Sequence, residues 1–595
     1  MQPAATEQGS ETGGMRSKVT IFVISGVLIV AFCLLGWRLF YLQYSRADYY
    51  RDLSYRARHA RVIETAQRGR MYDSSGPGGR LLAASNRILT VFMDPGLLAD
   101  WDEKMEVAGI LQPILGMSAP EICDIVEPRR NTRFVKLKAG ITEQQHAAIK
   151  EAISRKENRL RGVAIQSSWE RYYPMGRLTS TIIGVEGGNA DENGPQKIGL
   201  TGLEQRYESL LRGTEGENIL VVDKLRAPVG RDPSSTIAAK DGSSLVLTID
   251  TTIQEFARSE LLEQYKHYRA ESAVAIVMDP WTGAILAMVS IPDYDPDKLS
   301  STDPSALRNR ALTDPYEPGS IFKPIVVAAA LDQGIITRDE LIYCEDGHWD
   351  QYRIGEWAGH RFGNLTVKEI LAESSNIGMA KIGMKMGDRR LCEAVKMFGL
   401  GSKTQIDLPL EEAGQIWPLP WDKMCLTRVP YGHQINVTAI QMARAFCILA
   451  NGGRCVWPHL VRAVIEPDGK VTELNRKTNL AGQVIKRDVA EWIVREALTS
   501  VVNDGTGKEA AIEGYQVFGK TGTANIAGKG GYDEINYTSS FIGGAPADDP
   551  AVIVLVSIRR PDKSVDGKYS GGRVAAPVFK RILEKTMKYL ETNGT

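Results

Sequence analysis

The pattern of apolar and polar positions divides the chain into three stretches, and the first contains one unbroken apolar run. Residues 19–37, VTIFVISGVLIVAFCLLGW, carry no charge. A helix needs about 20 residues to cross a bilayer, so this run predicts a transmembrane helix over residues 19–38, with a buried core helix as the alternative. No small-residue cleavage site follows, so we expect a retained signal anchor. Residues 1–18, rich in Gly, Glu, Gln and Thr, predict a disordered tail.

The second stretch, residues 45–240, is polar and mixed. The short apolar segments RLLAAS and LTVFMD predict strands, and EQRYESLLRG has apolar positions at helix spacing. It contains no set of residues that suggests catalysis. We therefore interpret residues 45–240 as a scaffold.

The third stretch, residues 241–595, has strands at both ends and helices in the middle. GSSLVLTID predicts a strand, TTIQEFARSELLEQYKHY an amphipathic helix, and SAVAIVMD and AILAMVS a hairpin joined by PWTG. Near the end, YQVFGKTGTA, SSFIGGA and AVIVLVSI predict strands, and VAAPVFKRILEKTMKYLE a helix. This order predicts an α+β domain whose single sheet is made from both ends. Such a sheet brings the chain after residue 515 beside Ser320.

The composition argues against some classes of function but does not identify one. At 595 residues the chain is too long for one ordinary core. Lys+Arg 72 balances Asp+Glu 72, so no overall field favours nucleic acid as a partner. The seven cysteines include no C-x-x-C pair and the seven histidines no H-E-x-x-H, so we expect no metal site. Disulfides among the later cysteines stay open.

The segment TDPYEPGSIFKP, residues 313–324, places Ser320 and Lys323 three residues apart after a Pro-Gly turn. A serine can begin a helix, and positions i and i+3 of a helix share one face. A serine hydroxyl needs a neighbouring base to become a nucleophile, and a lysine serves if its pKa is lowered. A helix cap beside a surface lysine is the alternative.

Two further segments favour the catalytic interpretation of Ser320 and Lys323. LAESSNIGMA places Ser374 and Asn376 at a helix junction, and FGKTGTA places Lys520, Thr521, Gly522 and Thr523 on a strand. Each segment alone is better explained by caps, a surface lysine and a bulge. Together, and in this order, they match the three-part signature of serine acyl-enzymes that recognise penicillin.

With these motifs the chain resembles a class B penicillin-binding protein, a membrane-anchored D,D-transpeptidase of the bacterial cell wall. The resemblance extends over most of the chain. It includes RLFYLQ after the apolar run, QRGRMYDSSG, in which Ser74 replaces the usual arginine, GLEQRYESLLRGTEG, and RNRALTDPYEPGSIFKP. The last segment is closest to the cell-division (septal) branch of the family.

The resemblance implies a fold and an activity. Residues 241–595 would form a β-lactamase-like serine transpeptidase domain, with a central antiparallel sheet flanked by helices. Residues 45–240 would form an elongated, mixed α/β pedestal of the dimerisation type. The enzyme would cross-link peptidoglycan stem peptides through a serine acyl-enzyme in septal wall synthesis, and β-lactams would acylate it. The resemblance implies no metal or organic cofactor.

The resemblance also assigns roles to the motif residues. Ser320 would be the nucleophile and Lys323 the general base, with a pKa lowered by burial and by the charge of Lys520. Ser374 would pass protons, and Asn376 would bind the donor amide. The remaining roles are an oxyanion hole from the backbone N–H groups of Ser320 and Thr523, a carboxylate site of Lys520, Thr521 and Thr523, and a strand kept clear by Gly522.

The expected location is the bacterial cytoplasmic membrane. Arg16 and Lys18 precede the span, but more arginines follow it, namely Arg38, Arg46, Arg51 and Arg56. The local charge count therefore argues against an exported body. The resemblance implies the opposite orientation, with residues 1–18 cytoplasmic and one membrane pass. It also implies lipid-linked nascent strands as partners, with a multi-spanning glycan polymerase and other division proteins.

Three alternatives remain. A D,D-carboxypeptidase or β-lactamase on the same fold would need a second base for water. Glu411 and Glu412 are the candidates in the middle region, and we interpret both as exposed loop acids. The third alternative is a catalytically idle division scaffold or a β-lactam sensor. His433, in YGHQINVT, resembles a family element near the active site, and we interpret it as a structural loop histidine.

Overall fold

The computed structural model describes most of the chain in two compact units. The described residues are 11–98, 100–132, 135–155, 160–191, 194–222, 228–231, 236–474, 482–528, 531–567 and 570–593. One unit comprises residues 1–66 with 214–240, and the other residues 67–213 with 241–595. Residues 1–10 of the predicted disordered tail lie outside the described part of the chain, and residues 11–18 are helical, which corrects that part of the prediction.

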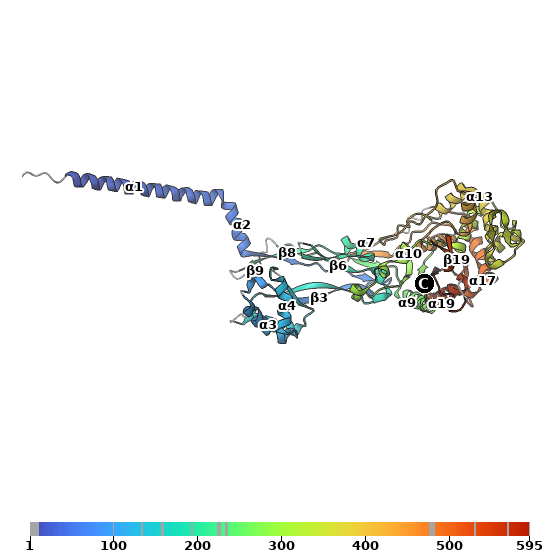
Figure 1. Cartoon of the computed structure of the whole chain (residues 1–595), viewed down its shortest axis with the longest axis horizontal. Coiled ribbons are helices and arrows are strands. Elements are labelled where there is room, and N and C mark those ends of the chain that lie inside the picture. The colour runs from blue at the N-terminus through green and yellow to red at the C-terminus, as the bar shows by residue number, and fades with distance from the viewer. Residues whose placement is uncertain are drawn as a thin grey trace, which may run out of the picture. The chain divides into compact units, whose positions relative to one another are not determined.

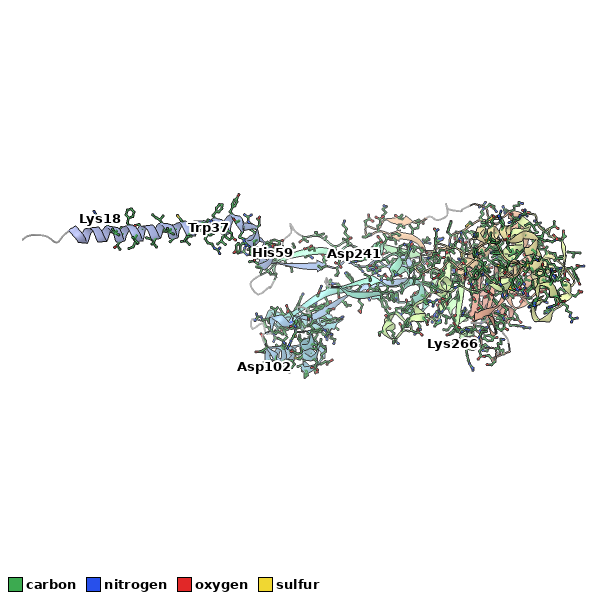
Figure 2. The ribbon with its side chains drawn as sticks, turned by 45° about the horizontal axis from the view of Figure 1, so that its top comes forward. Lys18, Trp37, His59, Asp102, Asp241 and Lys266 are labelled. Atoms are coloured by element: carbon green, nitrogen blue, oxygen red, sulfur yellow. The ribbon has the colours of Figure 1, made fainter. Side chains whose placement is uncertain are left out.

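The first unit begins with the predicted apolar helix. Helix α1 (Glu11–Phe40) continues through a π-helical turn, η1 (Tyr41–Ser45), and α2 (Ala47–Arg58) follows. Residues Lys18–Ser45 form a helix long and apolar enough to cross a membrane, with Lys18 and Trp37 labelled in Figure 2. The side chains of this apolar run are exposed, as expected of a helix whose contacts are with lipid. Strands β1 (His59–Glu64), β8 (Gly216–Val222) and β9 (Pro228–Arg231) complete the unit as a small sheet.

The scaffold part of the second unit is built on a seven-stranded sheet. Its order is β18 (Val471–Glu473), β17 (Val461–Ile465), β10 (Ser244–Leu247), β2 (Met71–Tyr72), β3 (Leu81–Met93) and β4 (Val135–Ala139), with β5 (Val163–Tyr172) also on β3. Helices α3 (Trp101–Leu115), α4 (Ala119–Val126) and α5 (Glu143–Ser154) pack beside β4 over a separate core.

Two predictions for this scaffold need correction. The segments RLLAAS and LTVFMD belong to the single strand β3, because the polar pair between them, Asn86 and Arg87, stays paired with β5. The helix predicted in EQRYESLLRG is two short ones, α7 (Gly202–Arg206) and α8 (Glu208–Leu211), separated at Tyr207.

A buried ion-pair cluster holds these short helices to the scaffold. Arg68 Nε donates to Glu204 at 2.6 Å and its NH2 to Glu208 at 2.6 Å, while Arg171 Nε donates to Glu204 at 2.7 Å. Glu204 is fully buried. Ser74 replaces the arginine that is usual in the QRGRMYDSSG motif. Its backbone N–H donates to the Ile249 carbonyl. Arg68 therefore forms its ion pairs with Glu204 and Glu208 although residue 74 is not a cation.

The second sheet confirms the sheet predicted from both ends of the third stretch, with one correction: the predicted strand GSSLVLTID forms β10 of the seven-stranded sheet instead, where it pairs with β2 and β17. The order of the second sheet is β12 (Ile285–Ile291), β11 (Ser272–Met278), β21 (Val552–Arg559), β20 (Gly531–Ala545) and β19 (Phe518–Gly528), all antiparallel. Helices α9 (Thr251–His267) and α19 (Ala576–Asn593) pack together beside it (Figure 1).

Both faces of this sheet are covered. On β11, Ala273, Ala275 and Val277 face the core shared with α9 and α19, and the alternate positions face a larger, mainly helical core. Side chains of a strand alternate between faces, so double burial requires a continuously apolar strand. The arrangement leaves the edge strand β19 beside the turn that contains Ser320.

Candidate active site

The turn that carries Ser320 is tighter than the predicted helix start. Ser320 lies in a 3₁₀ turn, η9 (Gly319–Phe322), and the α-helix α11 (Lys323–Asp332) begins only at Lys323. Pro324 has no N–H to donate and fits the first turn of a helix, which favours a start there. Gly319 has φ +57° and donates its N–H to the Gly432 carbonyl at 3.0 Å. The turn is thus anchored from its first residue.

Ser374 lies in the break between two helices. Helix α12 (Val367–Ala372) ends before it, and α13 (Asn376–Met397) begins after it, with Ser375 as N-cap. Ser374 adopts φ +58°, the left-handed region that non-glycine residues seldom occupy. Such a conformation costs about 1–3 kcal/mol, and the surrounding structure must maintain it.

The structure brings the predicted polar residues together around the Ser374 hydroxyl. Lys323 Nζ donates to Ser374 O at 2.6 Å, to Ser374 Oγ at 3.2 Å and to Asn376 Oδ1 at 2.9 Å. Lys520 Nζ lies 3.0 Å from the same Oγ and also contacts Thr521 O and Thr521 Oγ1 at 3.2 and 3.3 Å. Both lysine side chains are fully buried. One hydroxyl therefore bridges two amines that have no access to water.

Burial changes the proton affinity of both amines. It lowers the pKa of Lys323 to about 7, against an opposing effect of the Glu356 carboxylate, which favours the charged form. Burial, with the nearby charge of Lys323, also holds the pKa of Lys520 well below its usual value. Burial and mutual repulsion therefore disfavour a proton on both amines at once, and Ser374 Oγ lies within hydrogen-bond distance of each.

Strand β19 presents the other motif directly against the Ser320 turn. A Cβ at Gly522 would lie 2.9 Å from Ile321 Cγ2 and 3.1 Å from the Pro318 carbonyl oxygen, so a side chain there would displace the turn. Thr523 Oγ1 accepts from Gly571 N at 2.9 Å, and the hydroxyls of Thr521 and Thr506 lie 2.8 Å apart. The strand and the Ser320 turn are therefore closely fitted at Gly522. The predicted role of Gly522, to leave room for a substrate backbone, stays a prediction.

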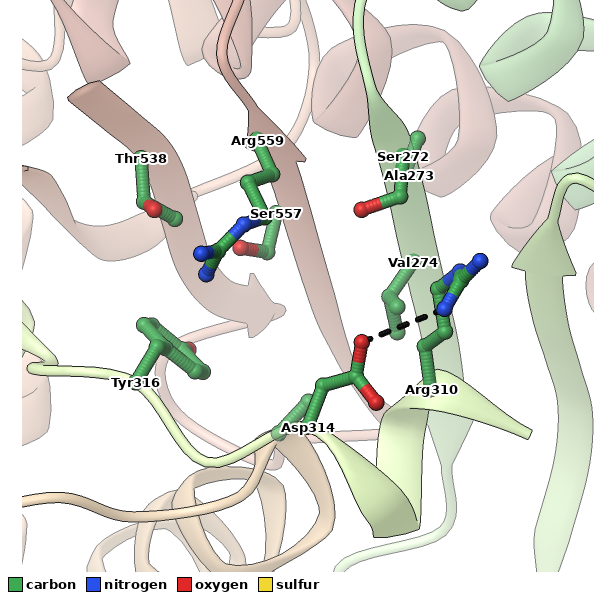
Figure 3. Close-up of a pocket in the computed structure, with 10 residues that line it drawn as sticks. Ser272, Ala273, Val274, Arg310, Asp314, Tyr316, Thr538, Ser557 and Arg559 are labelled. Atoms are coloured by element: carbon green, nitrogen blue, oxygen red, sulfur yellow. Dashed lines mark hydrogen bonds and ion pairs between the residues drawn. The ribbon is translucent and has the colours of Figure 1, made fainter. Parts of the chain in front are cut away.

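A small cavity lies beside this site, against the segment that leads to Ser320. It has a volume of about 30 Å³, room for about one water. Figure 3 shows Asp314 and Tyr316 on its lower side, with Arg310 bonded to Asp314 at 3.3 Å. Among the described residues, the buried Arg310 Nε atom has no hydrogen-bond partner. The residues that line this cavity are distinct from the motif residues.

Sequence reasoning missed one charged residue of the site, Glu356. Its carboxylate is 7% exposed and accepts from Asn376 N at 2.7 Å. The glutamate lies in a polar segment, RIGEWAG, with no motif around it. Only its position ahead of the Ser-Ser-Asn segment could have drawn notice, and position alone does not predict a contact.

The interpretation of the remaining candidates is partly corrected. His433 Nδ1 lies 3.0 Å from Glu317 Oε2, a contact that fits a structural loop histidine. Glu412 is exposed as predicted, but Glu411 is 6% exposed, which corrects its interpretation as an exposed acid. Glu411 accepts from Thr404 N, Thr404 Oγ1 and Gln405 N, so its oxygens are used within its own loop. All seven cysteines are free thiols.

Comparison with known proteins identifies this arrangement. Residues 273–584 match the family model of the penicillin binding protein transpeptidase domain, and residues 63–247 match that of the penicillin-binding protein dimerisation domain. The chain belongs to the penicillin-binding protein transpeptidase family. The predicted enzyme class, a serine D,D-transpeptidase, is confirmed, as is the α+β fold.

Full-length relatives agree with this assignment. The transpeptidase is 31% identical to stage V sporulation protein D of Bacillus subtilis, over 97% of this chain and 86% of that protein. It is 29% identical to peptidoglycan D,D-transpeptidase FtsI of Escherichia coli, over 94% and 90% of the two chains. A crystal structure of penicillin binding protein 3 from Mycobacterium tuberculosis, complexed with aztreonam, shares the fold with a TM-score of 0.65. That match has 24% identity and covers 89% of this chain and 97% of the other.

Proposed function

We propose that this transpeptidase cross-links peptidoglycan stem peptides with Ser320 as its nucleophile. The observation that carries the proposal is the Ser374 hydroxyl between two buried amines, 3.2 Å from Lys323 Nζ and 3.0 Å from Lys520 Nζ. Lys323 lies one turn after Ser320 and is neutral in a large fraction of molecules near pH 7. A neutral amine in that position is a general base for the hydroxyl.

In the acylation step, the acyl group of the donor peptide passes to Ser320. Ser320 Oγ attacks the carbonyl between the last two D-alanines, and its proton passes to Lys323. The C–N bond breaks, and D-alanine leaves with a proton delivered through Ser374. The backbone N–H groups of Ser320 and Thr523 bind the oxyanion, and loss of one such donor costs about 100- to 1,000-fold in rate. An amine of a second stem peptide then attacks the ester and releases Ser320.

The substrate's terminal carboxylate would bind beside Lys520, Thr521 and Thr523. A carboxylate there favours the proton of the lysine pair on Lys520, because an opposite charge raises the pKa of a neighbouring amine. Lys323 is then left neutral, ready to accept the Ser320 proton. Gly522 leaves room for the substrate backbone along β19, and Asn376 supplies the donor amide's hydrogen bond. β-Lactams carry a comparable acyl group and an acidic group, a carboxylate or a sulfonate, and the match to the penicillin-binding family model supports their binding here.

For the cellular role, we propose septal wall synthesis. The FtsI relative supports a septal role, and the sporulation relative makes spore-wall synthesis the second candidate. We propose that the catalytic domain lies outside the cytoplasmic membrane, with residues 1–18 inside, and that a multi-spanning glycan polymerase supplies lipid-linked nascent strands. The domain limits at residues 45, 240 and 241 and the site roles stay predictions. A fluorescent fusion tests the cellular role, because a septal enzyme collects at every division site in growing cells.

The experiment that tests the site is labelling of the purified full chain with a fluorescent penicillin, beside Ser320→Ala and Lys323→Ala. We expect a stable covalent band for the parent, none for Ser320→Ala and a much weaker one for Lys323→Ala. Label retained for many minutes fits a transpeptidase, whereas rapid release would indicate a hydrolase. Equal labelling of Ser320→Ala would remove the nucleophile assignment, and an unlabelled parent would leave the idle scaffold.

A further inference from the structure

The transpeptidase site contains a buried carboxylate for which the proposed steps have no use. Glu356 follows the short strand β15 (Ile354–Gly355) and is 7% exposed. Its oxygens accept from Ser375 Oγ at 2.6 Å, Asn376 N at 2.7 Å and Ile377 N at 3.2 Å. These backbone donors belong to the first turn of α13, where N–H groups lack partners within the helix and a negative charge is favoured.

The same contacts determine where Asn376 points. Ser375, fully buried, donates to Glu356 and accepts from Gly378 N at 2.9 Å. Asn376 Nδ2 donates to the Gly355 carbonyl at 3.2 Å, which leaves Oδ1 to accept from Lys323 at 2.9 Å. Residues 355 and 356 therefore hold Asn376 by both its backbone and its side chain, two residues after the left-handed Ser374.

We propose that Glu356 is a positioning residue of the transpeptidase site. Its carboxylate fixes Ser375 and Asn376, and so keeps Ser374 in the left-handed conformation that places its hydroxyl between Lys323 and Lys520. The inference rests on the proposed roles of those lysines and extends them. Without Glu356, two N–H groups and one buried hydroxyl lose their acceptor, and Ser374 loses the neighbours that hold its strained backbone.

A second consequence is electrostatic. The negative charge of Glu356 favours the protonated form of Lys323 and so limits the effect of burial on its pKa. Other charged or titratable groups act on this region from several elements, namely Lys520 on β19, Glu317 before the Ser320 turn, Arg428, Tyr431, Cys344 and Lys381. Removing only the Glu356 charge therefore lowers the pKa of Lys323 and makes the base available at lower pH.

The chain offers a matched control in Glu411. Glu411 is equally buried at 6% exposed, and it also accepts from one hydroxyl and two backbone N–H groups. Its partners, Thr404 and Gln405, belong to its own loop. Glu411→Gln thus repeats the chemical change of Glu356→Gln at a purely structural place.

The experiment measures the second-order rate of acylation by fluorescent penicillin against pH. It uses the full chain and compares the parent with Glu356→Gln, Glu356→Asp and Glu411→Gln. For Glu356→Gln we expect the acid midpoint to fall by about 0.5–1 pH unit. Its plateau rate falls by about 10-fold or more, because an amide NH₂ cannot accept from Asn376 N. Glu356→Asp keeps the charge but is one methylene shorter, so its plateau falls while its midpoint stays with the parent's.

Glu411→Gln should lose thermal stability yet keep the parent's midpoint and plateau. The proposal is overturned if Glu356→Gln behaves like Glu411→Gln, or if Glu356→Asp acylates at the parent's plateau rate. Thermal unfolding of each variant shows that the rates refer to folded protein, and Glu356→Asp still decides the matter if Glu356→Gln does not fold. Failure of the proposed function looks different, since labelling would then be absent from the parent or present in Ser320→Ala.

Discussion

Two buried clusters of charged side chains in the same unit are built on opposite principles. In the scaffold, Glu204 accepts from two arginines at 2.6 and 2.7 Å. Burial opposes the charge of Arg68, but Glu204 and Glu208 raise its pKa above the usual value. At the active site, Lys323 and Lys520 are as deeply buried, yet their direct contacts are to hydroxyl, carbonyl and amide oxygens.

The presence or absence of a contacting carboxylate separates buried cations that stabilise the fold from those that can act in catalysis. An ion pair in a dry site keeps both charges and is costly to break. An amine without a contacting carboxylate becomes a weaker acceptor of protons, and so titrates where a general base is useful. The two clusters should therefore respond in opposite ways to loss of a charge.

The largest expected effect is on catalysis at Lys323. Lys323→Met keeps the length of the side chain and removes the amine. We expect acylation by penicillin to slow by about 100- to 10,000-fold, the usual contribution of a general base. The free energy of unfolding at pH 7 should hold or rise, because a buried amine is replaced by an apolar group. Acylation at the parent's rate would refute the role of Lys323.

The next effect is on stability at Glu204. Glu204→Gln leaves Arg68 and Arg171 buried without a full counter-charge, and we expect unfolding to become easier by about 3–5 kcal/mol. Chemical denaturation measures this. The control is Glu584→Gln, which removes an exposed helix pair with Lys588 and should cost less than about 1 kcal/mol. Equal losses in the two variants would show that burial adds nothing to the scaffold pair.

An effect that grows to a similar size only at high pH appears in the pH dependence of stability. The pKa of Lys323 is about 7 in the folded chain and 10.5 when unperturbed. Between these values the unfolded state binds the extra proton, so stability rises with pH across this window. Below pH 7 both states bind the proton and the cost of burying it is constant. We expect the parent to gain on Lys323→Met by about 1.4 kcal/mol per pH unit within the window. A constant difference between pH 7 and 10 would contradict the lowered pKa.

The smallest expected effect is steric. In Gly522→Ala the new methyl group meets Ile321 Cγ2 and the Pro318 carbonyl at 2.9 and 3.1 Å. The Ser320 turn must shift by a few tenths of an ångström, so we expect acylation to slow by about 10-fold through misplacement of the nucleophile. Gly109→Ala, with no atom within 4 Å of the new methyl group, is the control and should label like the parent. An unchanged rate for Gly522→Ala would mean that the turn adapts freely.

Most of the fold was open to prediction because its strands and helices carry their own patterns. A sheet covered on both faces is predicted by the apolar runs of β11, β12 and β21 and by the amphipathic α19. The site motifs were equally local, since Ser320 and Lys323 lie three residues apart. What could not be predicted depends on contacts distant in sequence.

Glu356 shows why the remainder stayed hidden. Its partners lie about 20 residues away, across short irregular segments without periodicity. Glu411 was misjudged for a related reason, because acids in loops are usually exposed and only the fold shows that its oxygens are enclosed by Thr404 and Gln405. The helix start at Ser320 was placed one turn early, because a serine after Pro-Gly serves a 3₁₀ turn as well as an α-helix.

The strand order means that the catalytic sheet can be completed only late in synthesis of the chain. Strand β21 is the last of the five to leave the ribosome, yet it lies in the middle and joins β11 to β20. Until residue 559 has been synthesised, the strand with Lys520 has no route of hydrogen bonds to the first hairpin. Chains that end before β21 therefore lack the central strand of the catalytic sheet, and we expect them not to assemble the site around Ser374.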